Sequence, residues 1–294
     1  MIEPFLSDDA LLADVESVRD AHSDALHLWW LGQSGFLLYC HGRTVLFDPY
    51  LSDSLTHKYA NTEKPHVRIS RRVVDPARLD FVDVITSTHA HTDHLDAETL
   101  LAIGGVCKGR EAGRRGMSEE FTDPARLLFP ASIRSIVQQR VGEMYSCSDS
   151  LDAFGRRGFD QMEFIAVPAA HETLARDPEG QHLYLGYVWR YRGWTVYHSG
   201  DGVVYDGMVE NLRDFDIDVA ILPINAKVGN MNGADAAGLA KAIGARLVVP
   251  CHYDMFEFNT ADPGEQFVPA CERLGQPHRV LRLGERLTIE KETV

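Results

Sequence analysis

The segment Thr88-His89-Ala90-His91-Thr92-Asp93-His94 decides how this chain is interpreted. It places three imidazoles and one carboxylate within six residues, directly after Phe81-Val82-Asp83-Val84-Ile85-Thr86, which predicts a buried β-strand. Imidazole nitrogen and carboxylate oxygen are ligands that zinc, manganese and iron accept. A loop leaving a strand end can aim alternate side chains at one point. His89 and His91 would then share one ion, while Asp93 and His94 face a second. The alternative is a histidine-rich surface turn.

Three further segments place a potential ligand just after an apolar run, and these ligands are His171, Asp201 and His252. A β-sheet delivers ligands in this way, because the loops that leave neighbouring strands converge at one edge. An isolated histidine after a strand is more often a packed or surface residue than a ligand. Four such segments in one chain, one of them the dense motif, together predict a metal centre.

This combination resembles the metallo-β-lactamase superfamily. The matching residues are His89-x-His91-x-Asp93-His94, then His171, Ser199-Gly200-Asp201 and His252, and the resemblance runs from about Leu28 to the C-terminus. Within the superfamily the chain is similar to the L-ascorbate-6-phosphate lactonase family. That narrower likeness rests on Trp29–Gly35 (Trp-Trp-Leu-Gly-Gln-Ser-Gly), Thr88–Asp96, Tyr197–Asp201, Val249–Asp254 and Asn259–Pro263. The lactonases carry Asp where His171 stands, so at this position the chain has the ligand of the wider superfamily.

The resemblance implies an α/β fold, a four-layer αββα sandwich in a single domain with metal ions at one edge. It implies one ion held by His89, His91 and His171, a second held by Asp93, His94 and His252, and Asp201 bridging them. The cofactors would be two divalent metal ions, zinc or manganese, with iron as a further option. A metal-bridging hydroxide would attack the substrate, and Asp93 would be the catalytic residue that passes a proton to the leaving group.

Three functional hypotheses follow. The first is a metal-dependent hydrolase that acts as a lactonase on a small, sugar-like, phosphorylated cyclic ester. The second is a phosphodiesterase of the same superfamily, which uses the same pair of ions. The third is a non-catalytic metal-binding protein, against which the complete ligand set argues. An oxidoreductase with two irons is also conceivable within this superfamily.

Composition agrees with a soluble enzyme and narrows the function little further. The 294 residues are 45% hydrophobic, enough for a large core, and carry a formal net charge of −14. Nucleic-acid-binding domains usually present a basic face, so no nucleic-acid partner is expected. Two basic clusters, Arg68–Arg72 and Lys108–Arg115, are either solvated surface or a rim that attracts an anionic substrate.

No segment predicts a membrane span or a targeting leader. The five cysteines form no Cys-x-x-Cys pair, which predicts no disulfide scaffold and favours the cytoplasm. Cys251, beside His252, is expected to be a small buried residue rather than a ligand. The similarity to the lactonases further implies a homo-oligomer.

Alternating helix and strand patterns predict one continuous fold without internal repeats. We expect an N-terminal helical extension over residues 1–25 and a metal-dependent hydrolase domain over residues 26–294. The predicted helices are Asp8–His22, Asp96–Ile103 with Asp96 as N-cap, Ala131–Val141, Ala234–Ile243 and Pro263–Leu274. The predicted strands are Leu26–Leu31, Phe36–Cys40, Arg43–Phe47, Phe81–Thr86, Arg126–Phe129, Gln161–Val167, Leu183–Tyr191, Thr195–His198, Asp218–Leu222, Arg246–Val249, Arg279–Leu283 and Arg286–Ile289. Residues 50–74 are predicted to form a long functional loop.

Three residues beside the predicted ligands are candidates for supporting roles. Strand alternation predicts that His198 points away from the ions. Asp254 is a candidate to orient a ligating imidazole through its second ring nitrogen. Tyr253 is a candidate to donate a hydrogen bond to an oxyanion.

Two other segments carry candidates for the cleft itself. Of Trp29 and Trp30, one is expected in the core and the other in the wall of the cleft. The loop residues Asn225, Lys227 and Asn230 are either ordinary turn residues or substrate contacts.

Overall fold

Two β-sheets lie at the centre of the computed structural model, which describes residues 1–21, 23–107 and 125–291. The first sheet has the strand order β13-β1-β2-β3-β4-β5-β6, and the second has the order β12-β11-β10-β9-β8-β7. The strands of the first are β1 (Leu26–Gly32), β2 (Gly35–Cys40), β3 (Arg43–Phe47), β4 (Val84–Thr86), β5 (Arg126–Pro130), β6 (Ser148–Leu151) and β13 (Arg286–Ile289). Those of the second are β7 (Arg156–Phe159), β8 (Met162–Pro168), β9 (Leu185–Tyr191), β10 (Trp194–His198), β11 (Val219–Pro223) and β12 (Leu247–Cys251).

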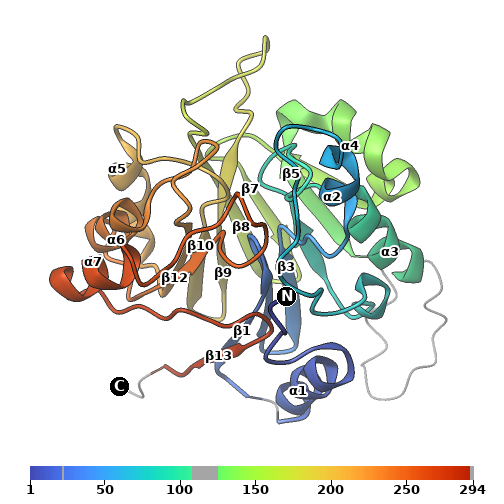
Figure 1. Cartoon of the computed structure of the whole chain (residues 1–294), viewed down its shortest axis with the longest axis horizontal. Coiled ribbons are helices and arrows are strands. Elements are labelled where there is room, and N and C mark those ends of the chain that lie inside the picture. Colours follow the sequence, from blue (N-terminus) through green and yellow to red (C-terminus); the bar gives the residue numbers. More distant parts are fainter. Residues whose placement is uncertain (22, 108–124, 292–294) are drawn as a thin grey trace.

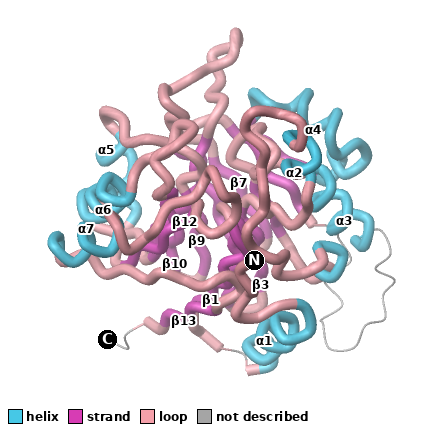
Figure 2. The backbone as a smooth tube through the Cα atoms, viewed as in Figure 1, coloured by secondary structure: helices cyan, strands magenta, loops and turns pink. Residues whose placement is uncertain are grey.

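Helices cover the outer faces of both sheets. They are α1 (Asp8–Asp20), α2 (Ser54–Tyr59), α3 (Ala97–Cys107), α4 (Arg134–Val141), α5 (Met208–Leu212), α6 (Gly233–Ala242) and α7 (Phe267–Leu274). In Figure 1, α2, α3 and α4 lie on one side of the molecule and α5, α6 and α7 on the other. Figure 2 shows the strands enclosed between these two helical layers. The predicted four-layer αββα sandwich in a single domain is therefore confirmed.

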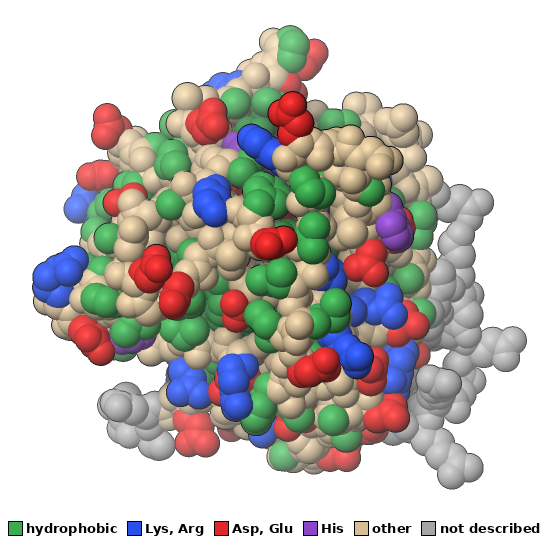
Figure 3. Space-filling model, in the orientation of Figure 1, with side chains coloured by type: hydrophobic (Ala, Val, Ile, Leu, Met, Phe, Trp, Pro, Cys, Tyr) green, Lys and Arg blue, Asp and Glu red, His purple; other side chains and the backbone are tan. Residues whose placement is uncertain are grey.

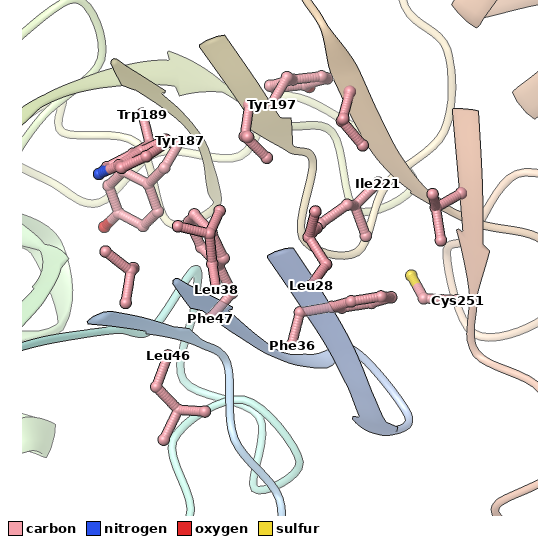
Figure 4. Packing of buried hydrophobic residues seen from close by; sticks show 14 of the residues in the cluster. Leu28, Phe36, Leu38, Leu46, Phe47, Tyr187, Trp189, Tyr197, Ile221 and Cys251 are labelled. Atoms are coloured by element: carbon pink, nitrogen blue, oxygen red, sulfur yellow. The ribbon is translucent and has the colours of Figure 1, made fainter. Parts of the chain in front are cut away.

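Buried apolar side chains fill the space between the two sheets. In Figure 4, Leu38 and Phe47 of the first sheet lie toward Tyr187 of the second, while Leu46 points to the opposite side. All four side chains are fully buried. Successive residues of a strand face opposite sides, so burial of both Leu46 and Phe47 means that β3 is covered on both faces. The sheet is thus held between its partner sheet and the helical layer.

Strand pairing brings the strand ends that matter for the site to one edge. β3 and β4 run parallel with Phe47 opposite Thr86, so Asp48 and the histidine motif leave the sheet side by side. In the second sheet β10, β11 and β12 are also parallel. Ligands of open α/β sheets bind beyond the carboxyl ends of parallel strands. This edge is therefore where the site is expected.

Most predicted elements form within a few residues of their expected bounds. The N-cap at Asp96 is confirmed, since its carboxylate accepts from the Thr99 backbone N–H at 3.2 Å. The strand before the histidine motif is shorter than predicted, because only Val84–Thr86 pairs with its neighbours. The last helix begins at Phe267 rather than Pro263, and α1 ends at Asp20, with His22 outside the described residues.

One predicted strand is wrong and several elements were not predicted. Residues Arg279–Leu283 form no strand, because the backbone N–H and C=O of Leu281 bond to the Tyr253 hydroxyl instead of to a neighbouring strand. The loop predicted over residues 50–74 contains the short helix α2. The elements β6, β7 and α5 were also missed. Each is short, with too few residues to produce a clear periodicity.

The N-terminal helix α1 packs on the same core as the rest of the chain, through Leu11, Val15 and Val18. The division into residues 1–25 and 26–294 stays a prediction. No described helix combines the length and apolar character needed to cross a bilayer. The four cysteines whose side chains are described, Cys40, Cys147, Cys251 and Cys271, are free thiols.

Candidate metal centre

The seven predicted ligands meet at one edge of the sandwich, although they lie far apart in the sequence. The histidine motif follows β4 in the first sheet, while the other three residues follow β8, β10 and β12 in the second. Each side chain is delivered by a loop that begins at a strand end, as the sequence predicted. The residues are His89, His91, Asp93, His94, His171, Asp201 and His252.

These residues form two groups that share a border. In each group the candidate ligand atoms all lie within 4.8 Å of one another. Group 1 comprises His89, His91, His171 and Asp201, and group 2 comprises Asp93, His94 and His252. The Oδ1 atom of Asp201 lies 3.2 Å from His94 Nε2 and 2.7 Å from His252 Nε2. The carboxylate of Asp201 therefore borders both groups, which matches the division that the family resemblance implies.

Five buried polar atoms at this centre form no hydrogen bond of acceptable geometry among the described residues, although Asp201 Oδ1 lies within ion-pair distance of His94 Nε2 and His252 Nε2. They are Nε2 of His89, His94, His171 and His252, and Oδ1 of Asp201. A buried polar atom without a partner costs about 1–3 kcal/mol, so native structures rarely cluster several of them. Divalent cations would satisfy all five, since each atom offers a lone pair. The donor set therefore fits metal ions.

The charges of the centre also favour a cation. Burial opposes a charge on the His94 ring, but three carboxylates, those of Asp201, Asp93 and Asp48, raise its pKa well above the ordinary value. Burial likewise opposes ionisation of Asp201, yet the imidazoles of His252 and His94 hold its pKa well below its usual range. The carboxylates therefore favour a positive charge at this position. A bound cation would supply the same charge.

Comparison with known proteins agrees with this geometry. A family model described as a β-lactamase superfamily domain matches residues 27–252. The chain belongs to the metallo-β-lactamase superfamily. This superfamily is metal-dependent, and membership supports hydrolase activity.

Individual relatives of this superfamily member are distant. It is 22% identical over 264 residues to the probable L-ascorbate-6-phosphate lactonase of Escherichia fergusonii, a match that covers 81% of this chain and 72% of that protein. It is similar in structure to Igni18, a novel metallo hydrolase of Ignicoccus hospitalis, with a TM-score of 0.64, 23% identity, and coverage of 91% of this chain and 100% of that chain. It is also similar to CmlA, a diiron β-hydroxylase of Streptomyces venezuelae, with a TM-score of 0.63 and 16% identity. That match covers 92% of this chain and 55% of that chain. At these identities the structural likeness establishes the fold alone.

The carboxylate of Asp48 supports the centre and was not recognised from the sequence. Its Oδ2 atom lies 2.6 Å from His94 Nδ1, and its Oδ1 accepts from the Thr88 backbone N–H at 3.1 Å and the Thr86 hydroxyl at 3.2 Å. A carboxylate bound to Nδ1 fixes the ring and leaves Nε2 for an ion. The available signal was an acid placed directly after the apolar strand β3, the same pattern that identified the ligands.

Two further residues surround His171. The Tyr184 ring stacks on the His171 ring at 4.8 Å between centroids and lies 5.2 Å from that of His89. Gly229 lies in the loop after β11, and a Cβ at this position would lie 2.5 Å from His171 Nδ1. Group 1 is therefore closed on this side by an aromatic ring and by a glycine that leaves no space for a larger residue. Neither residue was singled out from the sequence.

Two predicted supporting roles are wrong. The Tyr253 hydroxyl donates to the Leu281 backbone oxygen, and its ring stacks on Trp30 at 4.0 Å, so it lies in the interior and faces no substrate. Asp254 makes no hydrogen bond to His252 among the described residues. The partner of His252 Nδ1 is instead Gln33 Nε2, at 3.1 Å.

Two other predictions are confirmed and one is wrong. His198 points away from the centre, with Nε2 2.9 Å from the Ser34 backbone oxygen and its ring stacked on Phe47. Cys251 is a buried residue at the end of β12 and belongs to neither group. Both Trp29 and Trp30 are fully buried, so neither walls a cleft.

The loop after β11 carries turn contacts and one link to the centre. Asn225 Nδ2 donates to Asn259 Oδ1 at 2.6 Å, and Lys227 Nζ donates to the Phe258 backbone oxygen at 2.6 Å. Asn230 Oδ1 accepts from the Gly202 backbone N–H at 2.8 Å, which ties this loop to the loop of Asp201.

The two basic clusters differ in what the structure describes. In the first, Arg68 pairs with Asp53 at 2.9 Å and Arg71 with Glu3 at 3.2 Å, so both have structural partners. The second, Lys108–Arg115, lies outside the described residues.

Proposed function

We propose that this protein is a dinuclear metallohydrolase that opens the cyclic ester of a small, anionic, sugar-like molecule. The observation that carries the proposal is the pair of adjacent groups, in which Asp201 of group 1 borders group 2 and five buried polar atoms form no hydrogen bond of acceptable geometry among the described residues. Distant similarity to a probable lactonase supports the choice of a lactone as substrate.

Each group would hold one divalent ion. His89, His91 and His171 would bind the first, Asp93, His94 and His252 the second, and Asp201 both. Such ions act as Lewis acids toward a substrate oxygen and lower the pKa of bound water, which supplies a nucleophile at neutral pH without Ser or Cys. The nitrogen-rich set suits zinc, and the two carboxylates make manganese or iron acceptable.

Asp93 is the residue proposed to carry the proton. Its Oδ2 atom accepts from Gln33 at 2.8 Å, and its side chain is 14% exposed, the largest exposure among the group 2 ligands. Burial opposes its ionisation, but His94, His252 and the hydrogen bond from Gln33 together keep the pKa of Asp93 below its ordinary value, and a bound ion would act in the same direction. A carboxylate that is ionised before the reaction can receive a proton and pass it to the leaving alkoxide.

Positive charge for an anionic substrate would come from side chains close to the centre. Lys58 of α2 donates to the Thr92 hydroxyl at 3.3 Å, which places an ammonium beside the histidine motif. Arg68 is less suited, because it already pairs with Asp53. Acidic and basic side chains are interspersed on the face in Figure 3. Together with the net charge of −14, this distribution favours a small anion over a nucleic acid.

The test is metal analysis of the purified protein combined with a substrate screen. We expect two ions per chain and hydrolysis of sugar lactones in preference to bis-p-nitrophenyl phosphate. Turnover of the phosphodiester without lactone hydrolysis would favour the phosphodiesterase alternative. Two bound ions without turnover of either class would favour a non-catalytic metal-binding protein.

Variants of the ligands provide the second test. His91→Ala and Asp201→Ala should abolish activity and lower metal content while the circular dichroism spectrum stays unchanged. His41→Ala is the matched control, since His41 pairs with Asp24 away from the centre. Full activity in either ligand variant would refute the assignment.

We further propose that the protein acts in the cytoplasm as a homo-oligomer. The free thiols support a reducing compartment. Size-exclusion chromatography with light scattering tests the oligomeric state.

A further inference from the structure

Gln33 is a buried residue held firmly beside group 2. It lies in the turn between β1 and β2, with a backbone φ of 51° and a fully buried side chain. Its backbone oxygen accepts from Trp30 Nε1 at 3.0 Å and from the His252 backbone N–H at 3.1 Å. The position of its side chain relative to His252 is therefore fixed by the backbone.

The Gln33 amide reaches two members of group 2 from different sheets. Its Nε2 atom lies 2.8 Å from Asp93 Oδ2 and 3.1 Å from His252 Nδ1. Asp93 follows the first sheet and His252 the second. One side chain thus connects the carboxylate and an imidazole of the same group across the edge of the sandwich.

When an ion is bound to group 2, Asp93 needs a hydrogen-bond donor from this amide, whereas His252 needs an acceptor. An ionised Asp93 carboxylate only accepts hydrogen bonds, so it requires the NH₂ end of the amide. His252 can give Nε2 to an ion only if its proton is on Nδ1, and that proton then requires an acceptor. Gln33 Oε1 is buried and has no partner among the described residues. A rotation of the amide that keeps Nε2 on Asp93 would let this oxygen accept from Nδ1.

The Nδ1 atom of His94 has a different partner from that of His252, and this difference explains why residue 33 carries an amide rather than a carboxylate. His94 Nδ1 faces the Asp48 carboxylate, which accepts only and contacts no other member of group 2. A carboxylate at position 33 would repel Asp93. A glutamine offers an NH₂ group that donates and a carbonyl oxygen that accepts, so it can serve the carboxylate and the imidazole together.

We propose that Gln33 is a positioning residue that holds Asp93 and His252 in the geometry required by the ion of group 2. The inference rests on the proposed function, because it assumes that this group binds an ion. It predicts a selective effect: loss of the amide weakens the second ion and leaves the ion of group 1 unchanged.

The test compares Gln33→Met and Gln33→Ala with wild type by chelator competition against zinc and manganese. Methionine keeps the volume but has neither an amide donor nor an amide acceptor, whereas alanine also removes packing. Gln276→Met is the matched control, since Gln276 is another buried glutamine, whose side-chain amide donates to the backbone oxygens of Ala245 and Pro277. Both Gln33 variants should raise the dissociation constant of the second ion about 10- to 100-fold, the usual effect of losing a residue that orients a ligand. The control should bind both ions normally.

Each of the other possible binding results would lead to a different conclusion about Gln33 or about the two ions. Wild-type affinity for both ions in Gln33→Met would overturn the inference, and a loss confined to Gln33→Ala would assign Gln33 a packing role instead. Equal weakening of both ions would also overturn it, since the effect would then be general. A single ion bound per wild-type chain would overturn the dinuclear proposal itself.

Discussion

Gly229 provides a sharp test of the geometry of group 1, because a single added methyl group reaches a ligand. A Cβ built there would lie 2.5 Å from His171 Nδ1, 2.7 Å from Cε1 and 2.9 Å from Cγ. These contacts involve the ring itself, so the clash cannot be relieved at a flexible tip. In Gly229→Ala the His171 ring must turn away, and its Nε2 would leave group 1.

Two separable effects are expected from this substitution. The backbone at Gly229 has φ 79°, a left-handed conformation that costs a residue with a Cβ about 1–2 kcal/mol. This strain should lower the melting temperature by a few degrees. Displacement of His171 adds a local effect, a fall of about 10- to 100-fold in metal affinity or activity.

Gly180→Ala separates the two effects. Gly180 has φ 85° and no heavy atom within 4 Å of the added Cβ, so it carries the same strain without a clash. Both variants should lose similar stability in a thermal melt, while only Gly229→Ala should lose metal in elemental analysis and turnover in a lactone assay. If Gly229→Ala retains the metal content and rate of Gly180→Ala, His171 does not belong to the centre as described.

Three further predictions concern support of the centre, metal removal and pH. Asp48→Asn removes the charge that fixes His94 Nδ1, so activity or metal affinity should fall about 10- to 100-fold. Asp218→Asn should leave both unchanged, because Asp218 directly precedes β11, at the end of that strand away from the centre. Removal of ions with a chelator should lower the melting temperature, and restoring them to 100 times their dissociation constants should return about 2.7 kcal/mol for each ion, measured by urea unfolding. An unchanged melting temperature would count against bound ions. Burial, assisted by the charge of Arg286, lowers the pKa of His27 to about 4, so the unfolded chain takes up a proton first as the pH falls from 6.5 toward 4. Stability should drop by on the order of 2 kcal/mol over this range and less in His27→Gln, and equal acid sensitivity would contradict this origin.

The candidate ligands could be located from the sequence because each depends on local information. His89 to His94 are spaced within one loop, and His171, Asp201 and His252 each follow an apolar strand directly. The sheet then brings these loops together without any need to know which strands are neighbours. The same local logic explains why most helices and strands were predicted within a few residues of their bounds.

The supporting residues depend on pairings that no local pattern encodes. Asp48 reaches His94 only because β3 and β4 pair in parallel with Phe47 opposite Thr86. Gln33 contacts His252 across 219 positions of sequence. Tyr253 shows the opposite error, because its position in the sequence predicted a role at the centre that its side chain does not have. It is adjacent to a ligand, but its side chain enters the core and stacks on Trp30.

Both ligand groups draw on both sheets, and this couples the core to the chemistry. Group 1 combines His89 and His91 of the first sheet with residues of the second, and group 2 does the same through His252. The separation of the ligands is therefore set by how the two sheets pack, at contacts such as Phe47 on His198, whose rings are 5.3 Å apart. A shift of about 1 Å can cost on the order of 100-fold in rate. We therefore expect substitutions of the buried aromatic residues between the sheets to change the geometry of both groups, although none of these residues belongs to either group.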